Sequence, residues 1–280
     1  MRNFSLYPVH RRKLRLYAMW GQGFRPAPMI PHGVAALLLL AGGAMSQNPD
    51  FLQMPALDFE RTVFQAADQN RNEAPPICRA VIDRLKAGRA VSDRVILRCA
   101  EAHITAADRH ASPGAPKARV YHDAEQYIQD VLGSLSDRDL VTSQLQARLG
   151  DLAVAAGDFR KAAALFQSSY DAIESLHLDV DVQRISTLVK LGQSYLSFGQ
   201  KKDAERTFLE AMAYQWYTIT GHPMELQQLR DQYLLAARGL ITSRRGDLRA
   251  LDEIVFVPAT QNELGPVLQR AIDEAKGIGR

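Results

Sequence analysis

Two cysteines and two histidines are the residues in this sequence whose types and spacing best suit a metal ion. Cys99, His103 and His110 follow one another at i, i+4 and i+11, so an α-helix would place them on one face. Cys78 could approach from a neighbouring helix, and two thiolates with two imidazoles suit tetrahedral zinc. No Cys-x2-Cys or His-Glu-x2-His motif supports this set. A small exported enzyme or zinc-binding protein that uses these four residues is therefore one alternative.

The same cysteines could instead form a disulfide bond. They lie on the two arms of an expected helix–turn–helix over residues 77–107, with the turn at Gly88. In an oxidising compartment, two cysteines on adjacent antiparallel helices can be bridged. Two small buried side chains that never meet are the other interpretation. Cys78 and Cys99 are thus disulfide candidates, on condition that the chain is exported.

The search for catalytic motifs finds little. The sequence contains no Gly-x-Ser-x-Gly nucleophile motif and no Walker phosphate-binding loop. Asp179 and Asp181 form the nearest approach to a carboxylate pair, but acids between helices are usually solvated. We therefore predict a protein that is not an enzyme and has no cofactor.

The positive charge of the chain is concentrated at its start. The 280 residues contain 34 Lys and Arg against 31 Asp and Glu, a formal net charge of +3. Residues 1–46 hold six of the basic residues and no acidic one, which leaves a net charge of −3 for residues 47–280. No basic run is interleaved with aromatic residues, so we predict no binding to nucleic acid.

The first 46 residues have the parts of a secretory signal peptide or leader. Basic residues precede an apolar run over 34–45, and small residues follow it. The run is shorter than the roughly 20 residues that a spanning helix needs, so we predict cleavage and a periplasmic or secreted protein. The membrane would be contacted only through an uncleaved leader. A twin-arginine signal at Arg11-Arg12 is a second interpretation. A third is a true start at Met19 or Met29, with the protein a cytosolic adaptor.

The chain beyond residue 140 repeats itself. Two segments align without gaps at an offset of 42 residues. Each predicts two helices separated by a glycine turn, with a small residue where the paired helices approach each other. A third, degraded unit follows, in which Pro258 is expected to end the second helix early. An amphipathic helix that begins near Asn262 is the expected cap of the solenoid. The aligned pairs are Leu149/Leu191, Gly150/Gly192, Gly157/Gly199, Ala162/Ala204 and Phe166/Phe208.

This pattern resembles the tetratricopeptide repeat (TPR), and the period of 42 resembles the kinesin-light-chain-like branch of that family. The second unit matches the family pattern at Leu188, Leu191, Gly192, Tyr195, Ala204, Phe208 and Ala211. The resemblance implies an all-α fold, with a TPR-like helical-hairpin solenoid over residues 141–280. A less regular helical region over 47–140 precedes it, in which residues 77–107 could be a diverged repeat.

The resemblance also implies a function and a site. TPR proteins hold segments of other proteins in a concave groove lined by the first helix of each repeat. We therefore predict a non-catalytic interaction module or scaffold that binds a peptide or helix of another protein. Packing between neighbouring repeats is the alternative role for each groove position, and the oligomeric state is not predicted. The groove positions transferred from the family are Gln144, Asp151, Val154, Ser186, Val189, Gln193, Leu196, Tyr233 and Arg244.

Overall fold

The computed structural model describes residues 51–69, 76–110, 117–135, 139–176, 181–214, 223–251 and 258–277. These ranges form eleven α-helices and one 3-10 helix, and no strand occurs within them. The all-α prediction is confirmed. The predicted leader and Asp179 lie outside the described residues. Within those residues, no helix combines the length and apolar character needed to cross a membrane.

The N-terminal region packs around one apolar core. In α1, the buried side chains Phe59, Val63 and Ala67 recur every fourth residue, which gives the helix a single apolar stripe. This stripe joins buried residues of α3 and α5, including Ile96 and Ile128. The helices of this region are α1 (Ala56–Gln69), α2 (Ile77–Lys86), α3 (Asp93–His110), α4 (Lys117–Val120) and α5 (His122–Leu132).

Residues 77–107 do not form the close helix pair that a diverged repeat would require. The turn at Gly88 has the expected positive φ, at 65°. However, α3 packs mainly against α5 and α1 and only slightly against α2. The ten residues of α2 are too few to cover the 18 residues of α3. The structure thus places a short, partly buried helix beside α3, where the sequence allowed a diverged repeat.

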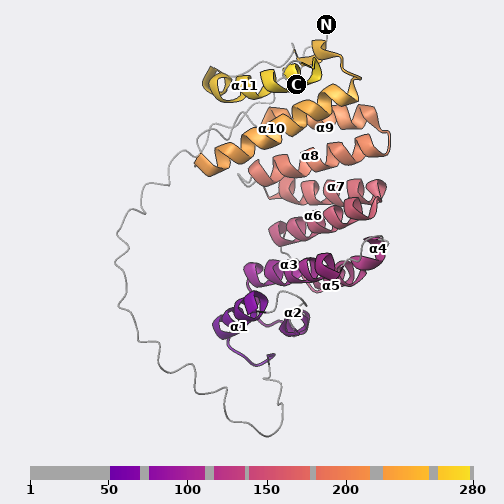
Figure 1. Cartoon of the computed structure of the whole chain (residues 1–280). Coiled ribbons are helices and arrows are strands. Elements are labelled where there is room, and N and C mark those ends of the chain that lie inside the picture. The colour runs from indigo at the N-terminus through magenta and orange to yellow at the C-terminus, as the bar shows by residue number, and fades with distance from the viewer. Residues whose placement is uncertain are drawn as a thin grey trace, which may run out of the picture. The chain divides into compact units, whose positions relative to one another are not determined.

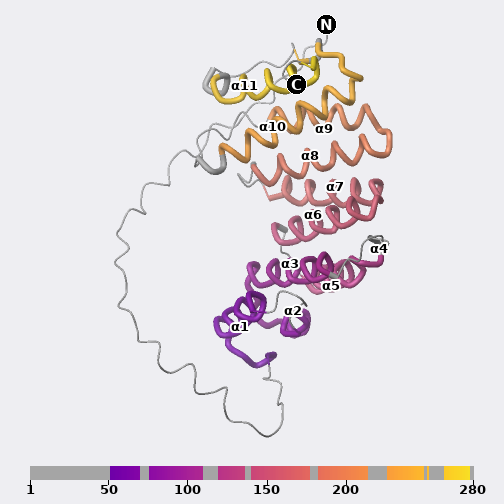
Figure 2. The backbone as a smooth tube through the Cα atoms, viewed as in Figure 1, coloured from indigo at the N-terminus to yellow at the C-terminus, as the bar shows by residue number. Residues whose placement is uncertain are grey.

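From α6 onward the helices stack in chain order, each against the next (Figure 1). The backbone tube in Figure 2 shows that successive helices of this stack run back and forth in alternating directions. Positive φ angles of 81° at Gly157 and 91° at Gly199 end the first helix of each pair, as predicted. The carboxylate of Asp158 accepts a hydrogen bond from the Lys161 backbone N–H and caps the next helix. These helices are α6 (Asp139–Ala156), α7 (Phe159–Ser175), α8 (Asp181–Ser197), α9 (Lys201–Tyr214) and α10 (Pro223–Ser243).

The C-terminal part differs from the expectation at one proline. After α10 the chain turns at Arg245 and Gly246 and forms the 3-10 helix η1 (Leu248–Leu251). Pro258 was expected to end a helix, but it begins α11 (Pro258–Ala275). The first position of a helix suits proline, because the missing N–H would have no partner there. Leu264 and other apolar side chains of α11 join the core against α10, the place expected for a cap.

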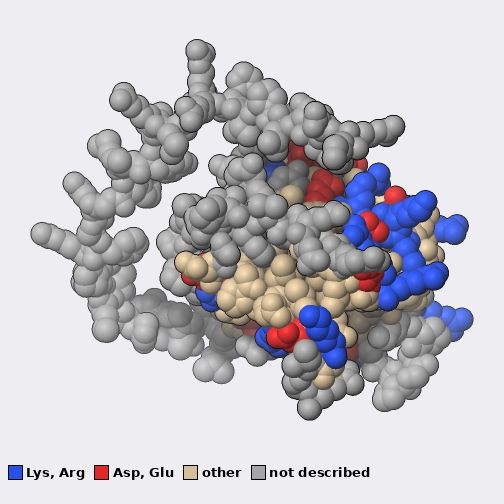
Figure 3. Space-filling view, turned by 90° about the horizontal axis from the view of Figure 1, so that it is seen from above, with Lys and Arg blue, Asp and Glu red and all other residues tan. Residues whose placement is uncertain are grey.

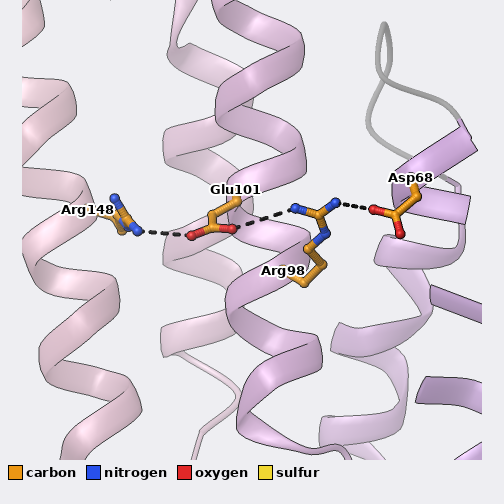
Figure 4. A network of polar contacts seen from close by, with 4 residues as sticks. All are labelled: Asp68, Arg98, Glu101 and Arg148. Carbon is orange, nitrogen blue, oxygen red and sulfur yellow. Dashed lines mark hydrogen bonds and ion pairs between the residues drawn. The ribbon is translucent and has the colours of Figure 1, made fainter. Parts of the chain in front are cut away.

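The boundary expected near residue 140 is not a break in packing. The core that begins at Phe59 continues into α6 as far as Leu152, and all the described residues belong to one compact unit. A chain of ion pairs also crosses this junction (Figure 4). Asp68 of α1 pairs with Arg98 of α3 at 2.5 Å, and Glu101 of α3 pairs with Arg148 of α6 at 3.0 Å. The N-terminal region and the repeats therefore share one core.

Candidate partner-binding site

Four of the predicted groove residues meet at one cavity. It has a volume of about 490 Å³ and lies where α6 and α8 run beside the start of α7. Asp151 and Val154 are one turn apart on α6, and Gln193 and Leu196 are one turn apart on α8. We call this cavity the α6–α8 pocket. It is the point where the sequence-predicted residues come together.

The walls of the α6–α8 pocket are largely apolar. Val154, Leu196 and Phe159 line them, and so does the buried residue Phe166. Val154 is 39% exposed, so solvent reaches its side chain where it lines the pocket. An apolar side chain from another molecule would be removed from water here together with Val154.

A charged pair borders the pocket. Lys190 Nζ lies 2.7 Å from Asp151 Oδ1 and 5.8 Å from the centroid of the Phe166 ring. Both charged side chains are 37% exposed, so the pair stays accessible to polar groups of a partner. Gln193 and Ser197 also line the pocket and add hydrogen-bonding groups. An apolar cavity with a polar rim is the general anatomy of a protein interface.

Three other predicted residues lie outside the pocket. The Gln144 amide donates a hydrogen bond to Gln183 at 3.1 Å, which links α6 to α8. Arg244 pairs with Glu205 at 2.7 Å and links the end of α10 to α9. Ser186 is half-buried on α8. Gln144 and Arg244 therefore connect one helix to another, which is the alternative role given above for the groove positions.

Val189 and Tyr233 correct the prediction. Both were expected in the groove, but they are 1% and 0% exposed and lie in the core. The reason is that α8 packs against α7, α9 and α10, so its buried face is wider than that of a helix with two neighbours. Tyr233 lies on α10, which packs against α8, α9 and α11. Neither side chain can reach a partner in this arrangement.

Other residues of the pocket were missed by sequence reasoning. Lys190, Phe159 and Ser194 line it but were not among the predicted positions. Lys190 precedes Gln193 by three residues, so the helical period could have placed it on the same face of α8. Phe159 follows the turn between α6 and α7, and only the packing of that turn shows where its ring lies.

The structure also decides between the two uses proposed for the cysteines. Cys78 and Cys99 form a disulfide between α2 and α3, with 5.4 Å between their Cα atoms. Since both sulfurs are bonded to each other, the zinc site with His103 and His110 is wrong. No group of His, Cys, Asp or Glu side chains suited to a metal occurs in the part of the chain that the structure describes.

Burial lowers the pKa of His103 to about 4, so its ring is neutral near pH 7.

The charge distribution gives little sign of a basic groove. Seen from above, lysine and arginine side chains gather along one edge of the described surface, with carboxylates among them (Figure 3). In α10 and the turn that follows it, Arg238 pairs with Glu274 and Arg244 pairs with Glu205. The absence of nucleic-acid binding stays a prediction.

Comparisons with known proteins agree with the repeat pattern. Residues 139–215 match the family model described as tetratricopeptide repeat. No curated protein matches the chain. Among solved structures, the crystal structure of BtubC (BKLC) from P. vanneervenii is 15% identical to this chain, with a TM-score of 0.40. The match covers 80% of this chain and 91% of that one. A TM-score this low supports no conclusion about function.

Proposed function

Residues 139–215 are tetratricopeptide repeats, and from this premise we propose that the chain is an exported, non-catalytic protein-interaction module. The α6–α8 pocket would hold a peptide or helical segment of another protein. One observation carries the proposal: Asp151, Val154, Gln193 and Leu196 were predicted from two separate repeats and converge on a single cavity.

The chemistry of the pocket defines the kind of segment it would hold. An apolar side chain of the partner would enter the cavity lined by Val154, Leu196 and Phe166. Polar groups beside that side chain would meet the Lys190–Asp151 pair and the amide of Gln193. A segment that alternates one apolar anchor with polar neighbours fits this arrangement.

Export is supported by two independent features. The basic leader with its apolar run has the composition of a secretory signal. The buried disulfide between α2 and α3 is the kind of bond that persists in an oxidising compartment. N-terminal sequencing of the protein from its host tests this part: a chain that begins near residue 47 is expected. An intact leader, or a cytosolic chain that begins at Met19 or Met29, would refute export.

Site-specific photocrosslinking in the host tests the pocket. A photoreactive phenylalanine analogue at Val154 should yield a defined adduct with another protein. The same analogue at Leu57, which is 78% exposed on α1, is the matched control and should not yield that adduct.

A second set of variants links the adduct to the cavity. Leu196→Glu places a charge in the pocket and should abolish the adduct at position 154, whereas Leu57→Glu should leave it unchanged. Equal adducts at both positions, or an adduct that survives Leu196→Glu in a folded protein, would count against this site.

A further inference from the structure

A second cavity lies in the N-terminal region, away from the repeats. It has a volume of about 710 Å³, and its walls come from α2, α3 and α5, with Val120 of α4 beside them. The disulfide between Cys78 and Cys99 joins two of these helices. The hydroxyl of Tyr127 on α5 donates a hydrogen bond to the carbonyl oxygen of Cys78 at 3.1 Å and ties the third helix to them. We call this cavity the α2–α5 pocket, and its walls are held in place before any ligand arrives.

The floor of the α2–α5 pocket is aromatic and uncharged. The rings of His103 and Tyr127 stack with their centroids 4.0 Å apart and an angle of 16° between their planes. Ile82 and Ala106 add apolar surface beside them. Because His103 is neutral at pH 7, this floor suits an apolar or aromatic group.

The rim carries both signs of charge. Arg79, Lys86 and the carboxylate of Asp83 line it from α2, while Asp123 and Asp130 line it from α5, so the formal charge is +1 on the α2 side and −2 on the α5 side. Arg79 and Asp123 both lie near enough to the His103 ring to act on its pKa, in opposite directions. A molecule on the floor would therefore have the net positive rim of α2 on one side and the carboxylates of α5 on the other.

These opposite charges do not pair with each other. Elsewhere, facing charges on packed helices meet directly, as Lys190 and Asp151 do at 2.7 Å. Among the described residues, no ion pair joins α2 to α5 across this pocket. All five charged side chains of the rim are exposed to solvent, and a ligand with both charges would be complementary to both sides.

We propose that the α2–α5 pocket binds a small zwitterion of the α-amino-acid class with an apolar or aromatic side chain. The carboxylate of the ligand pairs with Arg79, its ammonium group pairs with Asp123, and its side chain lies on the His103–Tyr127 floor. The cavity volume falls within the roughly 300–1,000 Å³ typical of small-molecule sites. This site is separate from the α6–α8 pocket and does not depend on its function.

Titration calorimetry of the purified, oxidised protein tests the proposal. The probes are single L-amino acids with apolar and aromatic side chains, together with the N-acetyl and amide derivatives of each. The zwitterions should bind, and loss of either charge should weaken binding by about 10-fold or more. The absence of binding by every zwitterion at millimolar concentration would overturn the proposal, as would equal binding of the N-acetyl or amide form.

Variants then locate the ligand. Arg79→Gln and Asp123→Asn should each weaken binding by about 10-fold. Arg160→Gln and Asp171→Asn are matched controls on exposed positions of α7 and should bind as the parent does. Ala107→Trp fills the cavity without changing a charge and should abolish binding, with the thermal midpoint as a check on folding. Undiminished binding in a folded Ala107→Trp protein would place the ligand elsewhere and refute the site.

Discussion

The ring of Phe208 occupies the space that a side chain at Gly192 would need. A Cβ atom on Gly192 would lie 2.7 Å from Cε1 of Phe208, well inside van der Waals contact. Gly150 and Phe166 repeat the relationship one unit earlier, at 2.6 Å from the same ring atom. The repeated glycine and phenylalanine are therefore a steric pair, and their contact sets how closely the helices of each pair approach.

We expect Gly192→Ala to lower the free energy of unfolding by about 1–3 kcal/mol, because the added methyl group overpacks a full core. Urea denaturation measures this value. Gly133→Ala is the control, since Gly133 has an ordinary φ of −67° and its nearest non-neighbour atom would lie 3.5 Å away. That variant should change stability by less than about 0.5 kcal/mol. Equal losses in the two variants would contradict the steric explanation.

The repeats could be predicted because their glycine and phenylalanine positions are coupled within each helix pair. Gly157 and Gly199 end helices through local backbone geometry, which sequence shows directly. The burial of Val189 depends on α10, which lies on the far side of α8, and no local pattern reports that contact. Proline can follow the end of one helix or occupy the first turn of the next. The sequence alone therefore did not show that Pro258 begins α11. The sequence predicted that Asp151, Val154, Gln193 and Leu196 line one groove, and the structure brings them to one pocket. The sequence did not predict that Phe159 lines the same pocket.

The buried guanidinium of Arg84 forms hydrogen bonds with the backbone of the segment that precedes α1. Its Nη1 atom donates hydrogen bonds to the carbonyl oxygens of Phe51 at 2.6 Å and Met54 at 2.7 Å. The guanidinium also lies 4.5 Å from the centroid of the Phe59 ring. Arg84→Met keeps most of the volume but loses these bonds, and we expect a loss of about 2–4 kcal/mol in unfolding free energy.

Limited proteolysis gives a local measure of the same change. Arg84→Met should speed cleavage near residues 51–54, and Arg84→Lys should not restore protection, because an ammonium group cannot reproduce the planar fork of donors. Arg79→Met, on the exposed side of the same helix, is the control. Similar cleavage rates in Arg84→Met and Arg79→Met would show that the segment does not depend on Arg84.

Removal of the disulfide should weaken the N-terminal region selectively. Cys78 and Cys99 are 21 residues apart, and closing a loop of this length contributes about 3 kcal/mol in the chain-entropy model. In the Cys78→Ala/Cys99→Ala variant, we expect faster hydrogen exchange in α2 and α3 and little change in α7–α9, since repeat stability is largely local. Reduction of the parent protein should have the same effect. Uniform acceleration along the chain would contradict a local role.

The neutral ring of His103 predicts a dependence of stability on pH. Burial lowers its pKa from the ordinary value of 6.5 to about 4; the charge of Asp123 opposes this shift and that of Arg79 adds to it. Above pH 6.5 both the folded and the unfolded chain hold a neutral imidazole, and this contribution to stability is fully present. As the pH falls from 6.5 to 4, the unfolded chain takes up the proton before the folded one, so the free energy of unfolding decreases.

His103→Phe isolates this contribution, because it keeps a ring against Tyr127 but removes the titrating group. The carboxylates that titrate near pH 4 are present in both proteins and cancel in the comparison. Between pH 7 and pH 4 the parent should lose about 1–2 kcal/mol more than His103→Phe, after allowance for partial solvent exposure of the ring. Urea denaturation at each pH measures the difference, and NMR titration of the imidazole gives its pKa. Parallel stability curves, or an imidazole that titrates near 6.5, would mean that the ring is hydrated and that the floor of the α2–α5 pocket is charged in mildly acidic solution.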